Sequence, residues 1–184
     1  MIPVIILTLS CCARKSTDTY FLHAIYLDKN DDNYTIYALS EKNGQKDAGY
    51  KVISRSGENP DDAASNLKNT YRDCYFATTE IYFLSEDSPK IISEIAKGIS
   101  TSNTFPSKSN VILIEGNVPD FMKAIKNENT FKHILRLCED GKVNAIKLFS
   151  HFLSGKSTLV PTLSIDENKE IKLVGLTEFS PNKE

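Results

Sequence analysis

The sequence predicts a mixed α/β fold, in which helices pack on a mixed sheet. The middle third alternates strand and helix patterns in a βαβαβ order, which favours right-handed crossovers and a partly parallel sheet. Strand patterns separated by short polar turns flank this run and predict antiparallel hairpins. The 184 residues, 40% hydrophobic and 25% charged, are typical of one folded domain.

The first hairpin consists of strands over Tyr20–Leu27 and Tyr34–Leu39, joined by a turn at Asp28–Asn33. A polar loop over Ser40–Gly49 then leads to a short strand, Tyr50–Ser54. These three strands precede the first helix.

Helix-start signals mark the next elements. Asn59 is a predicted N-cap with Pro60 at the first helical position, and the apolar residues that follow at helical spacing are Ala64, Leu67 and Tyr71. Ser88-Pro89 repeats the signal before a second helix, whose apolar face is Ile91, Ile92, Ile95 and Ile99. Strands are predicted at Thr79–Leu84 and Val111–Ile114.

The last third predicts helices and a second hairpin. The three short helices cover residues 118–126, 130–138 and 143–153, and Gly141 separates the last two. The hairpin pairs Leu159–Ile165 with Ile171–Phe179 across a turn at residues 166–169.

The N-terminus carries a candidate export signal. Residues 2–9 are apolar and end at Ser10-Cys11-Cys12, a length typical of a signal-peptide core. A small residue followed by Cys predicts a lipoprotein site, at which the thiol takes a diacylglyceryl group. Leu9 at the third position back favours Cys12, whereas Ser10 directly before the thiol favours Cys11. No Lys or Arg precedes Arg14, so either the start codon lies upstream or the segment is a buried N-terminal strand instead.

We therefore divide the chain into a signal segment (1–12), a polar tether (13–19) and one domain (20–184). The pair Arg14-Lys15 follows the anchor, where each charge would add about 1 kcal/mol of attraction to an anionic leaflet. The net charge of −2 argues against a nucleic-acid partner. No apolar run approaches the length of a transmembrane helix.

No motif predicts catalysis, a metal or a cofactor. Gly155-Lys156-Ser157 resembles the end of a phosphate-binding loop, but Ser150 stands where that motif needs glycine. The histidines, which lack metal-ligand spacing, are His23, His133 and His151. Cys74 and Cys138 are predicted to be two buried free thiols, with a disulfide or a nucleophilic Cys74 as alternatives.

Four stretches, in order, resemble the N-terminal part of the Ger(x)C family of spore germination lipoproteins, the C subunits of germinant receptors. They are Cys12–Lys15 with the strand ending Leu27-Asp28-Lys29; Ser56-Gly57-Glu58 before the Ala63–Tyr71 helix; Tyr75-Phe76 with the strand to Leu84 and Ser85-Glu86-Asp87; and Leu159–Ile165 with Ile171–Leu173 and Gly175–Phe179. Ala77 and Thr78 replace the family's Gly and His. Because family members continue into further domains, we expect a truncated or split member.

The resemblance implies a non-enzymatic, lipid-anchored subunit on the outer face of the spore inner membrane. It would work with the multi-spanning A and B receptor subunits in nutrient-triggered germination, as a docking or scaffold module, without metal or cofactor. The alternative function is a free-standing exported binding module without a lipid anchor.

Overall fold

The computed structural model describes residues 19–42, 49–101 and 105–181. Within these ranges the strands are β1 (Tyr20–Asn30), β2 (Asn33–Lys42), β3 (Tyr50–Gly57), β4 (Cys74–Tyr75), β5 (Ile81–Leu84), β6 (Asn110–Ile114), β7 (Thr158–Ile165) and β8 (Ile171–Phe179). The α-helices are α1 (Pro60–Thr70), α2 (Ile92–Thr101), α3 (Val118–Ala124), α4 (Glu128–Leu137) and α5 (Ala145–Leu153). Short 3₁₀ helices are η1 (Phe76–Thr78), η2 (Ser88–Ile91) and η3 (Glu139–Gly141).

The strands form one mixed sheet in the order β3-β2-β1-β5-β6-β7-β8, and β4 pairs with β1. Neighbours in the run β1-β5-β6-β7 are parallel, and the hairpin partners β2, β3 and β8 pair antiparallel on either side. The predicted mixed α/β fold is therefore confirmed. Although β3 directly precedes α1, it lies at the sheet edge, and the parallel neighbour of β5 is β1. The antiparallel pairing of β1, β2 and β3 places each new strand further from the centre.

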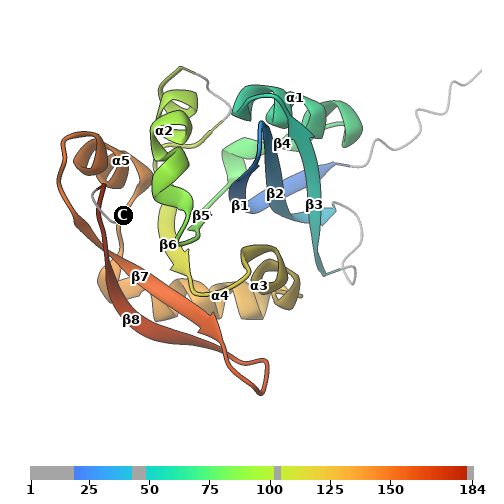
Figure 1. Cartoon of the computed structure of the whole chain (residues 1–184). Helices are drawn as coiled ribbons and strands as arrows, with labels where there is room; N and C mark the ends of the chain where they lie inside the picture. Colours follow the sequence, from blue (N-terminus) through green and yellow to red (C-terminus); the bar gives the residue numbers. More distant parts are fainter. Residues whose placement is uncertain (1–18, 43–48, 102–104, 182–184) are drawn as a thin grey trace, which may run out of the picture.

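Helices cover both faces of the sheet (Figure 1). One face packs against α1, α2 and α5, whose buried contacts include Leu67, Ile92 and Leu148. The other face packs against α3 and α4 through Phe121 and Ile134. In the part of the chain that the structure describes, none of the helices has the length and hydropathy needed to cross a bilayer.

The first hairpin turn is tighter than predicted. Asn30 pairs with Asn33, so only Asp31 and Asp32 form the loop, and Asp31 has φ 53°. Two-residue hairpin loops favour positive φ, which Asp tolerates. Strand β2 also continues through Glu41 into the segment predicted as a loop. The remaining predicted loop, residues 43–48, lies outside the described residues.

Asparagine caps set the starts of four helices. Asn59 accepts a hydrogen bond from the Asp62 amide at 2.9 Å, as predicted for α1. Three further caps were not predicted: Asn117 before α3, Asn127 before α4 and Asn144 before α5. Because Asn127 satisfies the Thr130 amide, α4 begins two residues earlier than the sequence indicated.

Candidate functional site

The predicted lipidation site, Cys12 or Cys11, lies outside the described residues and stays a prediction. The described chain reaches the sheet at Tyr20, where β1 begins. The strands β1, β3, β5 and β6 begin at this same edge, which we call the amino edge. Their opposite ends form the carboxyl edge. Both edges present polar groups, and they differ in chemistry.

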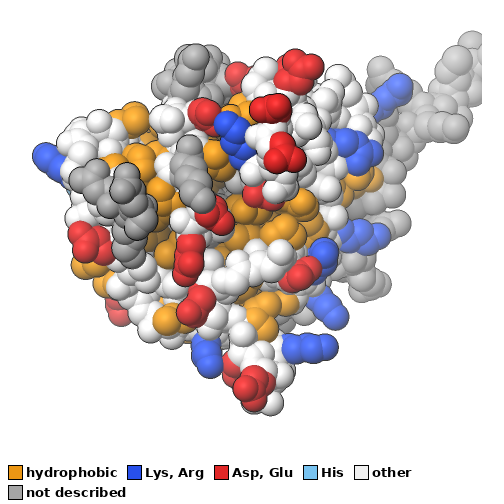
Figure 2. All heavy atoms as spheres, in the orientation of Figure 1, with side chains coloured by type: hydrophobic (Ala, Val, Ile, Leu, Met, Phe, Trp, Pro, Cys, Tyr) orange, Lys and Arg blue, Asp and Glu red, His pale blue; other side chains and the backbone are white. Residues whose placement is uncertain are grey.

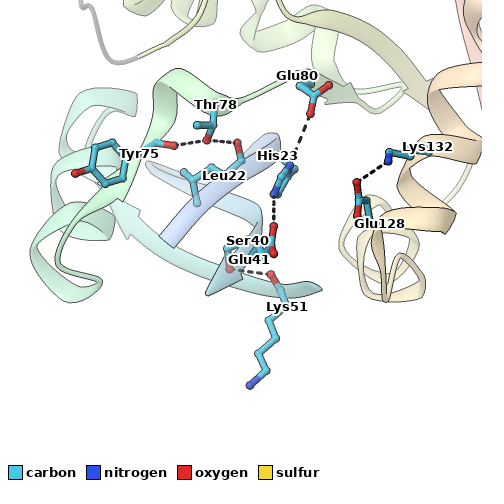
Figure 3. Close-up of polar contacts among 10 residues, drawn as sticks. All are labelled: Leu22, His23, Ser40, Glu41, Lys51, Tyr75, Thr78, Glu80, Glu128 and Lys132. Carbon is cyan, nitrogen blue, oxygen red and sulfur yellow. Dashed lines mark hydrogen bonds and ion pairs between the residues drawn. The ribbon is translucent and has the colours of Figure 1, made fainter. Parts of the chain in front are cut away.

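A histidine-centred cluster lies at the amino edge (Figure 3). His23 occupies a β-bulge, because the β1–β2 register shifts between Leu22 and Ala24. Its Nε2 lies 3.2 Å from a Glu41 carboxylate oxygen, and its Nδ1 lies 3.7 Å from Glu80. Bulges re-aim side chains, and here the bulge directs an imidazole between the carboxylates of Glu41 on β2 and of Glu80, which directly precedes β5.

Aromatic rings hold this imidazole from the β3 and α4 sides. Tyr50 stacks on His23 with ring centroids 4.7 Å apart, and Phe131 meets the ring edge-on at 5.6 Å. Burial, with a smaller effect of nearby carboxylates, raises the pKa of Tyr50 to about 12. Glu128 hydrogen-bonds Lys132, which lowers the pKa of the Glu128 carboxyl. The cluster thus ties together β1, β2, β3 and α4 and contains no nucleophile.

Thr78 fixes the neighbouring 3₁₀ turn to β1 (Figure 3). Its hydroxyl lies 2.9 Å from each of two carbonyl oxygens, those of Leu22 and Tyr75. This is the position at which the resemblance places a histidine in the family. In this chain the side chain holds η1 against the start of β1, which is a structural role.

The carboxyl edge is acidic. A hollow of about 480 Å³ lies between the β5–η2 loop and β8, and its lining includes Glu86, Glu115 and Glu178. Thr162 and Thr177 on the adjoining strands bond each other at 2.6 Å. The hollow therefore places carboxylates beside a pair of hydrogen-bonded threonine side chains.

The remaining candidates are dispersed. His133 is exposed on α4, and His151 bonds the Thr158 hydroxyl through Nδ1 at 3.0 Å. Among the described residues, no group of His, Cys, Asp or Glu side chains is placed to hold a metal ion. Gly155-Lys156-Ser157 forms an exposed turn after α5 rather than a loop between a strand and a helix.

Both described cysteines are free thiols. Cys138 is buried as predicted, whereas Cys74 is only partly buried. Burial raises the pKa of each thiol to about 11. A nucleophilic cysteine needs a lowered pKa, so the environment of Cys74 disfavours the thiolate alternative.

Sequence reasoning did not find the His23 cluster. His23 stands in an apolar strand pattern, and its partners Glu41, Glu80 and Phe131 lie between 18 and 108 residues further along the chain. A bulge leaves no local sequence signal here. The cluster emerges only when four elements meet at the amino edge.

Comparison with known families identifies this architecture. The model of the spore germination protein N-terminal domain matches residues 13–154, which include every described element from β1 to α5. Searches of curated proteins and of solved structures give no match. The matching domain gives the chain a role in spore germination. The chain therefore belongs to the Ger(x)C family of spore germination proteins, through the N-terminal domain of that family.

Proposed function

We propose that this protein is a lipid-anchored, non-enzymatic subunit of a spore germinant receptor, on the outer face of the spore inner membrane. The observation that carries the proposal is the family match, which begins at residue 13, directly after Cys12. Family membership supports association with other receptor subunits at that membrane. The polar clusters described above support a non-enzymatic role, since none pairs a nucleophile with a base.

The anchor is Cys12, with the diacylglyceryl group supplying two acyl chains. One acyl chain gives only marginal membrane binding, and a second hydrophobic signal makes anchoring stable. The apolar residues 2–9 act as the export signal and are removed on processing. The tether, residues 13–19, then joins the anchor to β1.

Docking on the multi-spanning A and B subunits uses the β7–β8 ribbon. This hairpin exposes four large apolar side chains to about half of their surface or more: Leu159 (57%), Leu173 (42%), Val174 (53%) and Leu176 (51%). Exposed apolar groups clustered on one element are typical of an interaction surface. They lie beyond residue 154, outside the segment that the family model matches.

Intact mass of the membrane-extracted protein tests the anchor. We expect a chain that begins at Cys12 and carries a diacylglyceryl group, and we expect Cys12→Ser to move the protein to the soluble fraction. Cys11→Ser is the matched control and should stay with membranes. An unmodified Cys12 together with unchanged fractionation of Cys12→Ser refutes the proposal. A soluble, cleaved chain without lipid supports the free-standing binding module instead.

Co-purification tests the docking surface separately. Leu173→Asp/Leu176→Asp should remain anchored but lose the A and B subunits. Ile146→Asp, at an apolar side chain on α5 that is 51% exposed, is the control away from the ribbon. Retention of both partners by the ribbon variant contradicts this docking surface and leaves the anchor untouched.

A further inference from the structure

We propose that the amino edge faces an anionic lipid bilayer, with Lys, Arg and Tyr side chains against the headgroups, while the acidic carboxyl edge points away. This orientation rests on the lipid anchor proposed above. The surface is defined by Lys51, Arg72, Tyr75 and Lys126, which come from β3, the α1–β4 turn, β4 and the α3–α4 loop.

The tether limits which surface can meet the bilayer. Tyr20 is the first residue of β1 and lies at the amino edge. Seven residues, 13–19, separate it from Cys12, so the Cα atoms of Cys12 and Tyr20 are eight steps and at most about 29 Å apart. A chain anchored at Cys12 therefore holds the amino edge nearest to the lipid.

Three cationic residues lie at the amino edge, two beside the start of β3 and one beside Tyr20. The Lys126 carbonyl accepts a hydrogen bond from the Tyr50 amide at 2.9 Å, which places Lys126 beside the start of β3 and its neighbour Lys51. Arg72 precedes Asp73, whose carbonyl accepts from the Tyr20 amide at 3.1 Å.

The cationic groups are available to phosphate. Lys51, Arg72 and Lys126 are all exposed, and none forms an ion pair with a described carboxylate. In Figure 3 the Lys51 side chain extends away from the polar cluster. Each such charge close to an anionic membrane contributes to binding.

Carboxylates at the same edge mostly have partners of their own. Glu41 and Glu80 flank His23, and Glu128 pairs with Lys132. Asp73 is the exposed acidic group next to Arg72. At this edge, Lys51, Arg72 and Lys126 lie outside the described ion pairs, and they share the edge with the carboxylates of Glu41, Glu80 and Asp73.

An aromatic pair completes the surface. Tyr75 is 48% exposed, and its ring stacks on Phe21 with centroids 5.7 Å apart. Tyr is enriched at membrane–water interfaces, because its ring is apolar while its hydroxyl stays in contact with water. Phe21 holds this ring at the amino edge, beside Tyr20.

The carboxyl edge has the opposite charge. Its loops expose acidic residues after four strands: Asp31, Asp32, Glu58, Asp61, Asp62, Glu86 and Glu115. In Figure 2 most red side chains lie at the top and left, whereas blue Lys and Arg side chains line the right-hand side, where β1 begins in Figure 1. An anionic leaflet attracts the surface that carries the Lys and Arg side chains and repels the acidic carboxyl edge.

Vesicle co-sedimentation tests this orientation without the lipid anchor. The full chain with Cys11→Ser/Cys12→Ser is mixed with phosphatidylcholine vesicles that contain or lack phosphatidylglycerol. We expect stronger binding to the anionic vesicles and a loss of about tenfold or more in Lys51→Glu/Lys126→Glu. The control Lys169→Glu/Lys172→Glu makes the same change in net charge in and next to the β7–β8 turn, and it should retain binding. Equal losses in both variants, or no loss in either, overturn the proposal.

A second pair of variants tests the aromatic contact. Tyr75→Ala should weaken binding several-fold even at high salt, where charge attraction is screened. Leu173→Ala removes a side chain of similar exposure from the ribbon and should leave binding unchanged. If Tyr75→Ala and Leu173→Ala bind the vesicles equally well, the proposed contact of Tyr75 with the headgroups is wrong. The proteins in the vesicle experiments lack both N-terminal cysteines. A negative vesicle result therefore does not contradict the proposed lipid anchor, and a negative intact-mass result does not change the vesicle result.

Discussion

The centre of the sheet and the β7–β8 ribbon are both rich in apolar residues, but they bury them to very different extents. The β5 residues Ile81 to Leu84 are at most 4% exposed, and helices cover both of their faces. In the ribbon, Leu173, Val174 and Leu176 are each exposed by more than 40%. Strand β7 pairs with β6 over only two residue pairs, so the rest of the ribbon extends beyond the sheet centre.

This difference separates stability from interaction. Buried apolar area stabilises the central strands, at roughly 25 cal/mol per Å² removed from water. The ribbon buries Val160, Leu163 and Phe179 in the core, whereas its exposed apolar groups on β8 remain available to a partner. Substitutions in the two regions should therefore act on different measurements.

The largest expected effect is in the centre. Phe83 is 1% exposed and meets Phe121 edge-on with centroids 5.4 Å apart. Phe83→Ala leaves a cavity between β5 and α3 and should reduce the free energy of unfolding by about 3–5 kcal/mol. Urea denaturation followed by circular dichroism measures this. If Phe83→Ala lowers the free energy of unfolding less than Leu176→Ala in the ribbon does, the contrast between a buried centre and an exposed ribbon is wrong.

The next largest loss of stability is expected at Gly57, where β3 packs closely against the start of α1. A Cβ at Gly57 would meet the backbone of Asp62 and Ala63, which cannot move without displacing the start of α1. Gly57→Ala should cost about 1–3 kcal/mol in the same assay. At Gly141 a Cβ would instead meet the tip of Leu176 on the ribbon, 2.5 Å away. Because the Leu176 side chain can rotate, Gly141→Ala should lower the free energy of unfolding less than Gly57→Ala does. A larger loss for Gly141→Ala would contradict a rigid centre.

Alkaline pH should lower the free energy of unfolding through the buried thiol of Cys138. Burial raises the pKa of its thiol from 9.0 to about 11. Between these values the unfolded chain loses the proton that the folded chain keeps, so stability is present below pH 9 and falls as the pH rises toward 11. Cys138→Ala should flatten that fall in urea denaturation across the range. An unchanged slope would show that Cys138 is not responsible.

The smallest effect belongs to the ribbon. Leu176→Ala removes a side chain that is 51% exposed and should change the free energy of unfolding by no more than about 0.5 kcal/mol. The same variant should weaken co-purification with the A and B subunits. A large loss of stability would mean that the Leu176 side chain belongs to the core.

Local signals predicted much of the fold. The cap at Asn59, the alternation of strand and helix, and the hairpin at Leu159–Ile165 each depend on residues close in sequence. Boundaries shifted where a cap such as Asn127 or a two-residue turn at Asp31-Asp32 went unrecognised. Those features also act locally, but their residue types fit several positions equally well.

The candidate surfaces could not be predicted in this way. No sequence pattern marks the four residues that define this surface, which are Lys51, Arg72, Tyr75 and Lys126. Their segments reach one edge only because β1 pairs with β2, β4 and β5, and because β2 pairs with β3. The bulge that turns His23 toward Glu41 and Glu80 likewise depends on register between strands.

By itself, the sequence determined the fold class and the family, because apolar periodicity, helix caps and ordered motifs are carried by neighbouring residues, and the anchor at Cys12 or Cys11 stays a prediction. Tertiary structure alone decided that β1 lies beside β5, and that Lys51, Arg72, Tyr75 and Lys126 come to one edge of the sheet. The physical reason is that strand order and register follow from which faces bury one another, and that choice is made between segments far apart in the chain.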